Sequence, residues 1–308
     1  MIGIGGVASY VPNGKLDNLA QAIAFGESDR FITDKIGALY LPVKDRDQET
    51  SDLAVESVLE LSTRFGLPLE SIDALVVVTQ NPDGAGLPHT AAIVHSKLGL
   101  PSRVAAFDLS LGCSGYIYGL SILKGLMEQA HLKNGILVTA DPYSKVIDRE
   151  DRVTSLLFGD AATATWLCGN PEWHFGCPLL ETDGAGGNSL RIDERRKLSM
   201  HGRRVFDFAA RRVPEQIERY LTINQLRHTD IDLFCIHQGS SAIVDAISRR
   251  FPDVKERFVK DISHTGNTVS SSIPLLIEKN VLGRSLNSAL LCGFGVGLSW
   301  ATNVIKKV

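Results

Sequence analysis

The order of apolar segments in the first half of the chain recurs in the second half. Three pairs of segments match: 72–77 with 231–236, 108–110 with 261–263, and 134–138 with 287–291. The pairs keep their order and the last two are separated by the same interval, which favours an internal duplication. The interval shortens after the first pair, which fits a longer loop at 81–88 in the first half. We therefore predict two similar halves, residues 1–166 and 167–308.

Within the first half, apolar strand-like runs alternate with segments of helical periodicity. Strands are expected at 72–79, 104–110 and 135–140, and helices at 51–65, 89–98 and 113–129. The run 72–79 is continuously apolar, as is typical of a strand buried on both faces. The alternation predicts an α/β fold with a largely parallel sheet. Equivalent strand ends from the two halves would then meet in one cleft, where such sheets bind ligands.

Composition narrows the class of protein. The 308 residues are 44% hydrophobic with a formal net charge of −3, so no charge excess indicates a nucleic-acid partner or a membrane surface. The apolar start of the chain lacks a basic region, which predicts a first strand rather than a signal peptide. No apolar run is long enough for a transmembrane helix. The five cysteines form no C-x-x-C pair, which disfavours a disulfide framework or a metal site and fits a reducing cytoplasm.

Cys113 lies at the junction between an expected strand and an expected helix, with Gly112 and Gly115 on either side. Glycine lets the backbone bend sharply at such a junction. The first turn of a helix offers unpaired N–H groups and the positive end of the helix dipole, and both favour a thiolate. We therefore predict a nucleophilic cysteine. The alternative is a buried structural cysteine that packs as a small apolar side chain.

The duplication indicates where the partners of Cys113 should lie. His237 ends an apolar strand and is followed by small polar residues. Asn267 lies between turn-forming residues in the loop that corresponds to the Cys113 junction. Both are candidate catalytic residues. His264 ranks below them, since it corresponds to Leu111 and precedes the junction.

With these residues placed, the chain resembles the β-ketoacyl-acyl-carrier-protein synthase III family of the thiolase superfamily over nearly its whole length. The motifs that carry the resemblance are Gly112-Cys113-Ser114-Gly115-Tyr116, Phe158-Gly159-Asp160, His237-Gln238, the segment 264–274, and the glycine-rich segment 293–300. The resemblance implies a thiolase-like five-layered α/β/α/β/α fold from two duplicated halves, and a homodimer. It also implies a Cys-His-Asn triad at Cys113, His237 and Asn267.

The family's chemistry implies a decarboxylative Claisen condensation, as in fatty acid biosynthesis. An acyl-coenzyme A, expected to be medium-chain, transfers its acyl group to Cys113. A malonyl-acyl-carrier protein or malonyl-coenzyme A then loses carbon dioxide, and its enolate attacks the acyl group to give a β-ketoacyl thioester. His237 and Asn267 would donate hydrogen bonds to the enolate oxygen. Coenzyme A thioesters are substrates here, so no metal or other cofactor is expected.

The resemblance assigns substrate binding to Phe31, Lys35, Leu87, Arg152, Phe158, Gly202, Phe206, Phe294 and Val296. Some of these depart from the family's usual residues. Phe31 and Lys35 replace a tryptophan and an arginine that grip the nucleotide of coenzyme A, and lysine lacks the bidentate geometry of arginine. Val296 replaces a glycine, so that a side chain enters a place that is normally bare, at the expected mouth of the pocket.

Carrier-protein docking also departs from the family pattern. Ala242 and Asp207 replace basic docking residues, and Gly239-Ser240 replaces an Ala-Asn pair that bonds pantetheine. Six arginines either compensate or form an ordinary solvated basic face; they are Arg203, Arg204, Arg211, Arg212, Arg249 and Arg250.

The loop 81–88 bears on chain length. By resemblance it reaches across the dimer and closes the far end of the partner's acyl pocket. Leu87 stands where some acetyl-preferring members have a phenylalanine. Leucine is smaller, and Gly84 and Gly86 let the loop shift. A deeper pocket is therefore expected, with a preference for medium chains.

Three alternatives remain. An acyltransferase of the same family would keep Cys113 and His237 and move the acyl group to an alcohol or amine without decarboxylation. A thiolase needs a second catalytic cysteine where this chain has Phe294, and Cys292 is expected in the core. A non-catalytic subunit of a heterodimer tends to lose triad residues, and all three are present.

Overall fold

The computed structural model of the protein describes all residues from Met1 to Val308. Ten strands form one sheet: β1 (Gly3–Tyr10), β4 (Ala74–Val78), β5 (Ala105–Leu109), β6 (Asn134–Ala140), β7 (Ala162–Cys168), β8 (Trp173–Phe175), β9 (Leu179–Thr182), β12 (Leu233–Ile236), β13 (Ser288–Gly295) and β14 (Ser299–Lys307). Two small sheets pair β2 (Gly14–Asp17) with β3 (Tyr40–Val43), and β10 (Leu190–Ile192) with β11 (Leu198–Met200). The order in the large sheet is β12-β13-β14-β8-β1-β7-β6-β4-β5, and β9 also pairs with β14.

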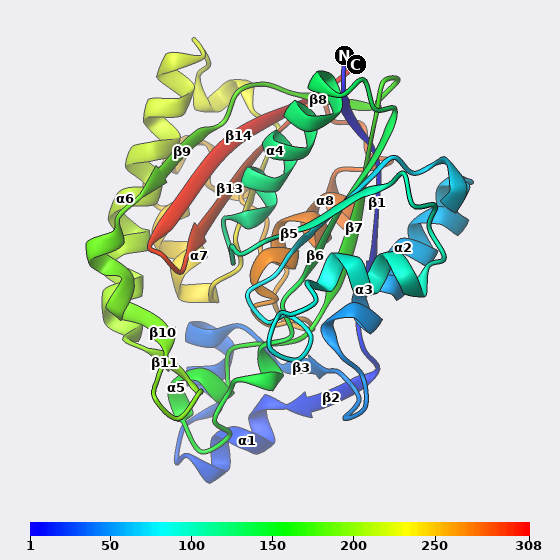
Figure 1. Cartoon of the computed structure of the whole chain (residues 1–308). Helices are drawn as coiled ribbons and strands as arrows, with labels where there is room; N and C mark the ends of the chain where they lie inside the picture. The colour runs from blue at the N-terminus through cyan, green and yellow to red at the C-terminus, as the bar shows by residue number, and fades with distance from the viewer.

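Eight α-helices complete the fold: α1 (Asn18–Ala24), α2 (Thr50–Phe65), α3 (Thr90–Lys97), α4 (Gly115–Gln129), α5 (Arg152–Ser155), α6 (Gly202–Ile223), α7 (Ser241–Ser248) and α8 (Ser272–Asn280). Helices α4 and α8 lie between the two parts of the sheet, and the largest apolar cluster fills this middle layer. Helices α2 and α3 cover the outer face of one part, and α6 and α7 cover that of the other (Figure 1). The molecule therefore has the five-layered α/β/α/β/α arrangement of the thiolase fold.

The strand order repeats in the two halves. In the first, β4, β6 and β7 lie side by side, and in the second, β12, β13 and β14 do so in the same relative directions. The segment 261–263, which matches the end of β5 in the sequence, forms no strand, and an isolated bridge between Phe234 and Phe258 flanks β12. The boundary predicted after residue 166 falls inside β7, and the two-domain division stays a prediction.

The prediction of a largely parallel sheet is wrong. Only the pairs β4–β5, β4–β6 and β12–β13 are parallel, whereas the pairings of β1, β7, β8, β9 and β14 are antiparallel. The reason is that β7 and β14 turn back beside β6 and β13, since no crossover helix carries the chain over the sheet. The parallel strands still send their carboxyl ends toward one region, which positions the site.

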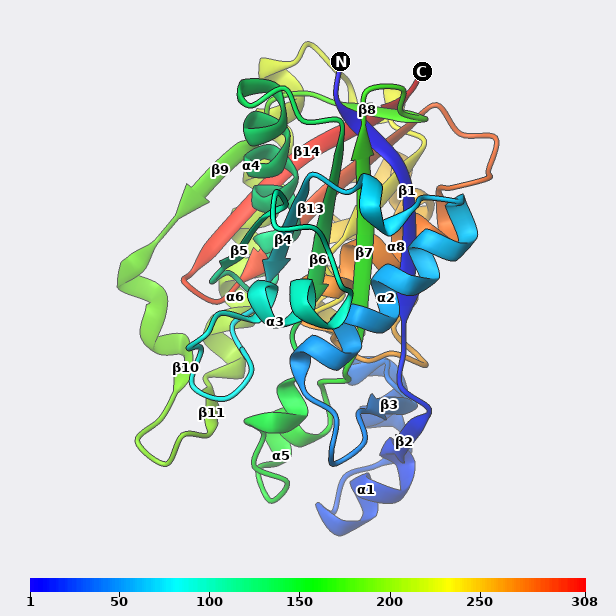
Figure 2. The same cartoon turned by 45° about the vertical axis from the view of Figure 1, so that its right-hand side comes forward.

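Helix α1, strands β2 and β3, and helix α5 gather at the end of the molecule opposite the two termini (Figures 1 and 2). No helix of the structure is long and apolar enough to cross a membrane.

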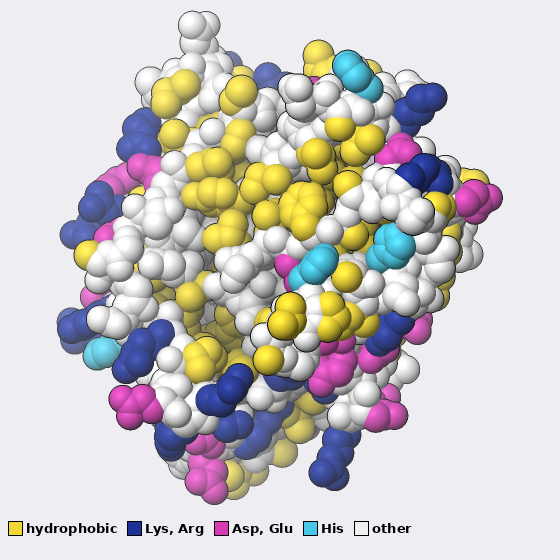
Figure 3. All heavy atoms as spheres, in the orientation of Figure 1, with side chains coloured by type: hydrophobic (Ala, Val, Ile, Leu, Met, Phe, Trp, Pro, Cys, Tyr) yellow, Lys and Arg dark blue, Asp and Glu magenta, His cyan; other side chains and the backbone are white.

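One surface carries an apolar patch, which we call the β5 face. Phe107 and Leu109 of the edge strand β5 are partly exposed there, beside Ile122 of α4 and Leu180 of β9, each 40% exposed. Figure 3 shows hydrophobic side chains gathered over α4 and β5. Both an open strand edge and an apolar patch are features that folded proteins ordinarily cover.

Candidate active site

Cys113 lies between β5 and α4, two residues before the helix begins. The backbone is tightly packed around it. A Cβ atom on Gly112 would lie 2.6 Å from the side chain of Gln80, and one on Gly295 would lie 2.8 Å from the Cys113 sulfur. The contact at Gly295 shows that the end of β13 lies directly against the Cys113 thiol.

The start of the helix does not by itself make the Cys113 thiol acidic, and its role as the nucleophile stays a prediction. The side chain is 5% exposed, and burial raises the pKa of the thiol to about 12, with the carboxylate of Asp141 acting in the same direction. The backbone N–H groups of Cys113 and Val296 lower the pKa, as a helix N-terminus would, but by less. Sequence periodicity places the thiol at the helix start and carries no information about how deeply that start is buried.

His237 follows β12 and is 2% exposed. Burial lowers the pKa of its imidazole to about 3, so the ring is neutral. Its Nδ1 lies 2.9 Å from the hydroxyl of Ser272, and that hydroxyl also accepts the backbone N–H of Gln238 at 3.0 Å. The ring of Phe294 packs edge-on against the imidazole, with centroids 5.3 Å apart. These contacts fix the ring and leave Nε2 for the cavity.

Asn267 is 4% exposed and its orientation is set by the backbone. Its Oδ1 accepts the N–H of Val269 at 2.9 Å, so the amide NH₂ group is the part left for the cavity. Val269 adopts φ 54°, a conformation that β-branched residues rarely take. The Val269 carbonyl acts on His237 and raises its pKa, against the larger effect of burial. One strained residue thus contacts both partners of Cys113.

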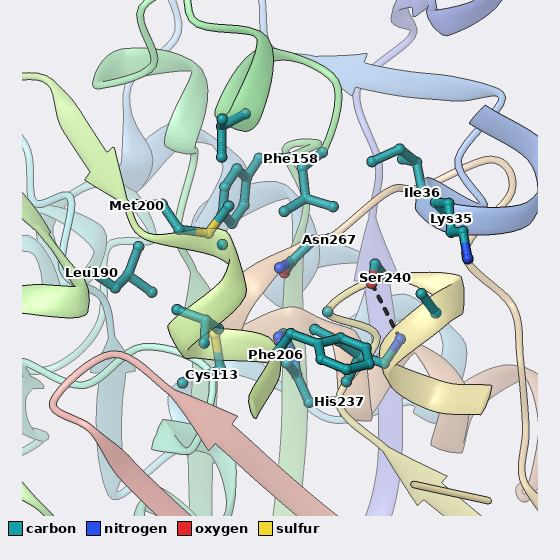
Figure 4. A pocket seen from close by; sticks show the side chains of 18 of the residues that line it. Lys35, Ile36, Cys113, Phe158, Leu190, Met200, Phe206, His237, Ser240 and Asn267 are labelled. Atoms are coloured by element: carbon teal, nitrogen blue, oxygen red, sulfur yellow. Dashed lines mark hydrogen bonds between the residues drawn. The ribbon is translucent and has the colours of Figure 1, made fainter. Parts of the chain in front are cut away.

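The three side chains share one cavity of about 410 Å³. Figure 4 shows Cys113, His237 and Asn267 facing the same space. The structure places the following predicted residues on the cavity wall with them: Phe31, Lys35, Arg152, Phe158, Gly202, Phe206 and Phe294. The sequence-predicted triad is therefore assembled from β5–α4, β12 and the loop before α8.

The outer wall of the cavity is aromatic and basic. Phe31 and Lys35 belong to the π-helical turn Phe31–Ile36. The guanidinium of Arg152 lies over the Phe31 ring, 5.7 Å from its centroid, and forms an ion pair with Glu27. All six arginines noted above are exposed, and Arg203 lies 3.9 Å from Asp207.

Two predicted residues do not line this cavity. Val296 does not form part of the cavity wall in a single chain, and its role in substrate binding stays a prediction. Its side chain points toward Gly112, where the missing side chain leaves room, and it joins the apolar cluster around Cys113. Leu87 is 93% exposed on the loop 81–88 and lies outside the cavity of its own chain, so its reach into a partner stays a prediction.

Sequence reasoning assigned no role to three side chains that surround the triad. Ser272 holds His237, and Asp141 and Tyr143 follow β6 at the same sheet edge as Cys113. Asp141 is fully buried, accepts hydrogen bonds from Gln80 N–H and Ser270 Oγ, and has a pKa raised by burial to about 6. The signal in the sequence that could have identified Asp141 is its position as a polar residue directly after a buried strand.

The other four cysteines are free thiols placed elsewhere. Cys168, Cys235 and Cys292 are buried, and Cys177 is exposed. Cys292 is fully enclosed within β13, as expected for a core residue, which disfavours a second catalytic cysteine. The chain has no group of three or more His, Cys, Asp or Glu side chains arranged to hold a metal ion.

Comparison with protein-family models gives two matches. Residues 107–194 match 3-oxoacyl-[acyl-carrier-protein] synthase III, and residues 221–307 match the C-terminal region of the same enzyme. Among curated proteins, the β-ketoacyl-[acyl-carrier-protein] synthase III of Streptococcus pyogenes is 32% identical over 97% of each chain.

Solved structures agree with this match. The β-ketoacyl-[acyl-carrier-protein] synthase III of Thermus thermophilus superimposes with a TM-score of 0.91 at 33% identity, over 99% of each chain. The priming β-ketosynthase of a polyketide biosynthetic pathway has a TM-score of 0.89 at 27% identity, over 99% of this chain and 96% of its own.

Proposed function

The chain belongs to the 3-oxoacyl-[acyl-carrier-protein] synthase III family of condensing enzymes, and we propose that it condenses an acyl-coenzyme A with a malonyl thioester through an acyl-Cys113 intermediate. The observation that carries the proposal is the shared cavity, in which the Cys113 thiol faces His237 and the amide NH₂ of Asn267. A nucleophile and two hydrogen-bond donors are what an acylation followed by an enolate step requires.

The acylation step needs a proton acceptor, because the resting thiol is neutral. His237 accepts the thiol proton at Nε2 if Nδ1 carries the ring hydrogen. Ser272 can accept that hydrogen, since its hydroxyl oxygen has a second lone pair beside the one taken by Gln238 N–H. The thiolate attacks the thioester carbonyl, and the N–H groups of Cys113 and Val296 bind the oxyanion that forms. Coenzyme A leaves as the thiol.

The decarboxylation step uses the opposite tautomer. When the Ser272 hydroxyl donates to Nδ1, the hydrogen of His237 lies on Nε2 and can be donated to the malonyl thioester oxygen, together with an Asn267 N–H. Each such donor contributes about 3–4 kcal/mol to the transition state. The C–C bond to the carboxylate breaks, carbon dioxide leaves, and the resulting carbanion attacks the acyl-Cys113 carbonyl and releases the thiolate.

The aromatic and basic outer wall supports coenzyme A as the acyl donor. Phe31 offers a face for an adenine ring, and Lys35 and Arg152 offer positive charge for phosphates. Either malonyl-acyl-carrier protein or malonyl-coenzyme A would follow the same channel. The exposed arginines at the start of α6 would attract an acidic carrier protein.

A homodimer with a medium-chain pocket completes the proposal. The open β5 edge and its apolar face are suited to pair with a second copy. Leu87, which is 93% exposed, would then enter the partner's cavity. A leucine leaves more depth than a phenylalanine, and each buried methylene adds about 0.8 kcal/mol to binding.

The test is a malonyl-dependence assay with purified protein. Intact-mass analysis after incubation with octanoyl-coenzyme A should show one octanoyl group, located on Cys113 by peptide mapping. Adding malonyl-acyl-carrier protein or malonyl-coenzyme A should release carbon dioxide and yield a β-ketoacyl thioester. Cys113→Ala is the control and should give neither adduct nor product.

Other outcomes separate the alternatives. Acylation of Cys113 and transfer to an alcohol or amine, without carbon dioxide release, would identify an acyltransferase. Neither activity in a folded protein would favour a partner subunit. An acyl group found on Cys168, Cys177, Cys235 or Cys292 would contradict the assignment of Cys113.

A further inference from the structure

The cavity contains one polar group that the proposed reaction does not use, the hydroxyl of Tyr143. Tyr143 begins the short 3₁₀ turn after β6, lines the cavity with Cys113 and is 4% exposed. Its ring packs against Phe158, with centroids 4.8 Å apart. Figure 4 shows Phe158 pointing into the cavity. The Tyr143 ring is thus held in place by packing at the acyl-binding part of the site.

The hydroxyl has no hydrogen-bond partner in the chain. Burial raises the pKa of the Tyr143 phenol well above its usual range, with the nearby Asp141 and Cys113 acting in the same direction, and no hydrogen bond contributes. The Tyr143 oxygen is nevertheless accessible, since it is not one of the fully enclosed polar atoms of the chain that lack a hydrogen-bond partner. It therefore faces the open space of the cavity.

Apolar side chains pack around the Tyr143 ring. Leu157, Phe158 and Leu190 belong to the same buried cluster as Tyr143 and Cys113, and all of them line the cavity. A plain alkyl chain would pack well against these side chains. It would also cover the hydroxyl, which would then lose hydrogen bonding to water without gaining a new partner. That loss disfavours an alkyl chain at this point, and it would be avoided if the occupant carried an oxygen there.

We propose that Tyr143 is a specificity-determining residue that selects acyl groups bearing a hydroxyl on the chain, over the corresponding unsubstituted chains. This inference rests on the proposed function, since it takes the cavity as the acyl-binding site. The phenol both donates and accepts, so it can pair with a hydroxyl in either direction. The surrounding apolar side chains would hold the rest of the chain.

The test compares octanoyl-coenzyme A with its isomers hydroxylated at successive carbons. Tyr143→Phe removes the hydroxyl and keeps the ring stacked on Phe158. Acylation of Cys113 is followed by intact mass, and kcat/KM is measured for each substrate with wild type and variant. The kcat/KM of the wild type should be about three- to tenfold higher for at least one hydroxy isomer than for octanoyl-coenzyme A, which is the range that one hydrogen bond allows. Tyr143→Phe should abolish that preference, so that the ratio of kcat/KM between the hydroxy isomer and octanoyl-coenzyme A falls to about one or below.

Binding to Cys113→Ala, with and without Tyr143→Phe, repeats the comparison by calorimetry in the absence of chemistry. If octanoyl acylates Cys113 but no hydroxy isomer is favoured, the Tyr143 inference fails and the proposed function stands. If a hydroxy isomer binds preferentially through Tyr143 but nothing acylates Cys113, the proposed reaction fails and the inference stands.

Two further results would overturn the inference. A retained water would satisfy the phenol, and then wild type and Tyr143→Phe would show the same ratio between substrates. A hydrogen bond from the loop of a second copy would make Tyr143→Phe weaken octanoyl and its hydroxy isomers alike. A hydroxyl preference that disappears only in Tyr143→Phe distinguishes the proposal from both.

Discussion

Cys113 and His237 are both uncharged in the resting site, because each is buried and neither has a fixed partner of opposite charge. Asn267 differs from them, since its orientation depends on a single backbone contact with Val269. The chemistry of these three side chains therefore has two separable parts. The nucleophile depends on proton transfer within the site, and the enolate depends on how two donors are aimed.

Asn267→Asp should separate the two half-reactions. The aspartate keeps an oxygen for Val269 N–H but offers no N–H to the enolate. Decarboxylation should fall by about a hundred- to a thousandfold, as for loss of one oxyanion donor. Acylation of Cys113 by octanoyl-coenzyme A should remain within a few-fold of wild type. Carbon dioxide release and intact mass measure the two steps, and condensation at the wild-type rate would remove Asn267 from the enolate step.

His237 should make stability depend on pH. Its pKa in the folded protein is about 3, below the unfolded value of 6.5, so the unfolded chain binds the proton first. The stabilising contribution of the neutral ring is present above pH 6.5 and is lost as pH falls toward 3. The free energies of unfolding of wild type and His237→Gln, measured in urea, should therefore become more similar as the pH is lowered from 7.5 to 5. Parallel curves would mean that the ring titrates normally.

Elements were predicted from sequence where apolar periodicity decides them. Strands β4, β5 and β6 and helices α2, α3 and α4 lie within a few residues of their predicted ranges. The Cys113 junction was also located correctly. Strand direction was not predicted, because the residue pattern of β7 and β14 contains no signal that distinguishes parallel from antiparallel pairing.

Contacts between distant elements account for what the sequence could not show in the site. The pKa of Cys113 depends on the end of β13 closing over it, and the aim of Asn267 depends on the φ angle of Val269. Tyr143 is a strand-end residue like His237, but only the packed cavity reveals that its hydroxyl lacks a partner. Such features arise from packing rather than from local pattern.

The loop between β4 and α3 should set the acyl chain length. Its base is fixed by Asp83, which accepts the N–H and hydroxyl of Ser51, and by the Lys145 ammonium, which donates to the carbonyl of Pro82. Leu87→Phe should therefore reduce acylation by octanoyl-coenzyme A far more than by acetyl-coenzyme A, since the added ring volume would shorten the partner's pocket. Equal effects on both substrates, or a wild type that prefers acetyl, would contradict this role.

In the whole molecule, β5 is an edge strand of the large sheet and lies beside an apolar face. The cavity of a single chain contains no residue of the loop 81–88. Association through the β5 face would bury the exposed strand edge and bring each loop toward the other copy. Assembly and substrate choice would then depend on the same surface.

Phe107→Glu should weaken the dimer, because it places a charge on the β5 face at the expected interface. Ile223→Glu is the matched control, since Ile223 is 64% exposed at the end of α6 and lies outside that face. Sedimentation should show monomers for Phe107→Glu and dimers for the control and wild type, with circular dichroism confirming that each is folded. A wild-type monomer, or an unchanged Phe107→Glu dimer, would place the interface elsewhere.

The deep burial of Cys113 also bears on oxidative damage. Peroxide attacks thiolates, and a thiol whose pKa is raised to about 12 holds almost none at neutral pH. The burial that keeps Cys113 as a neutral thiol should therefore also protect it from oxidation to sulfenic acid until an acyl donor binds. After brief peroxide exposure, a dimedone probe should label the exposed Cys177 and leave Cys113 able to accept an acyl group.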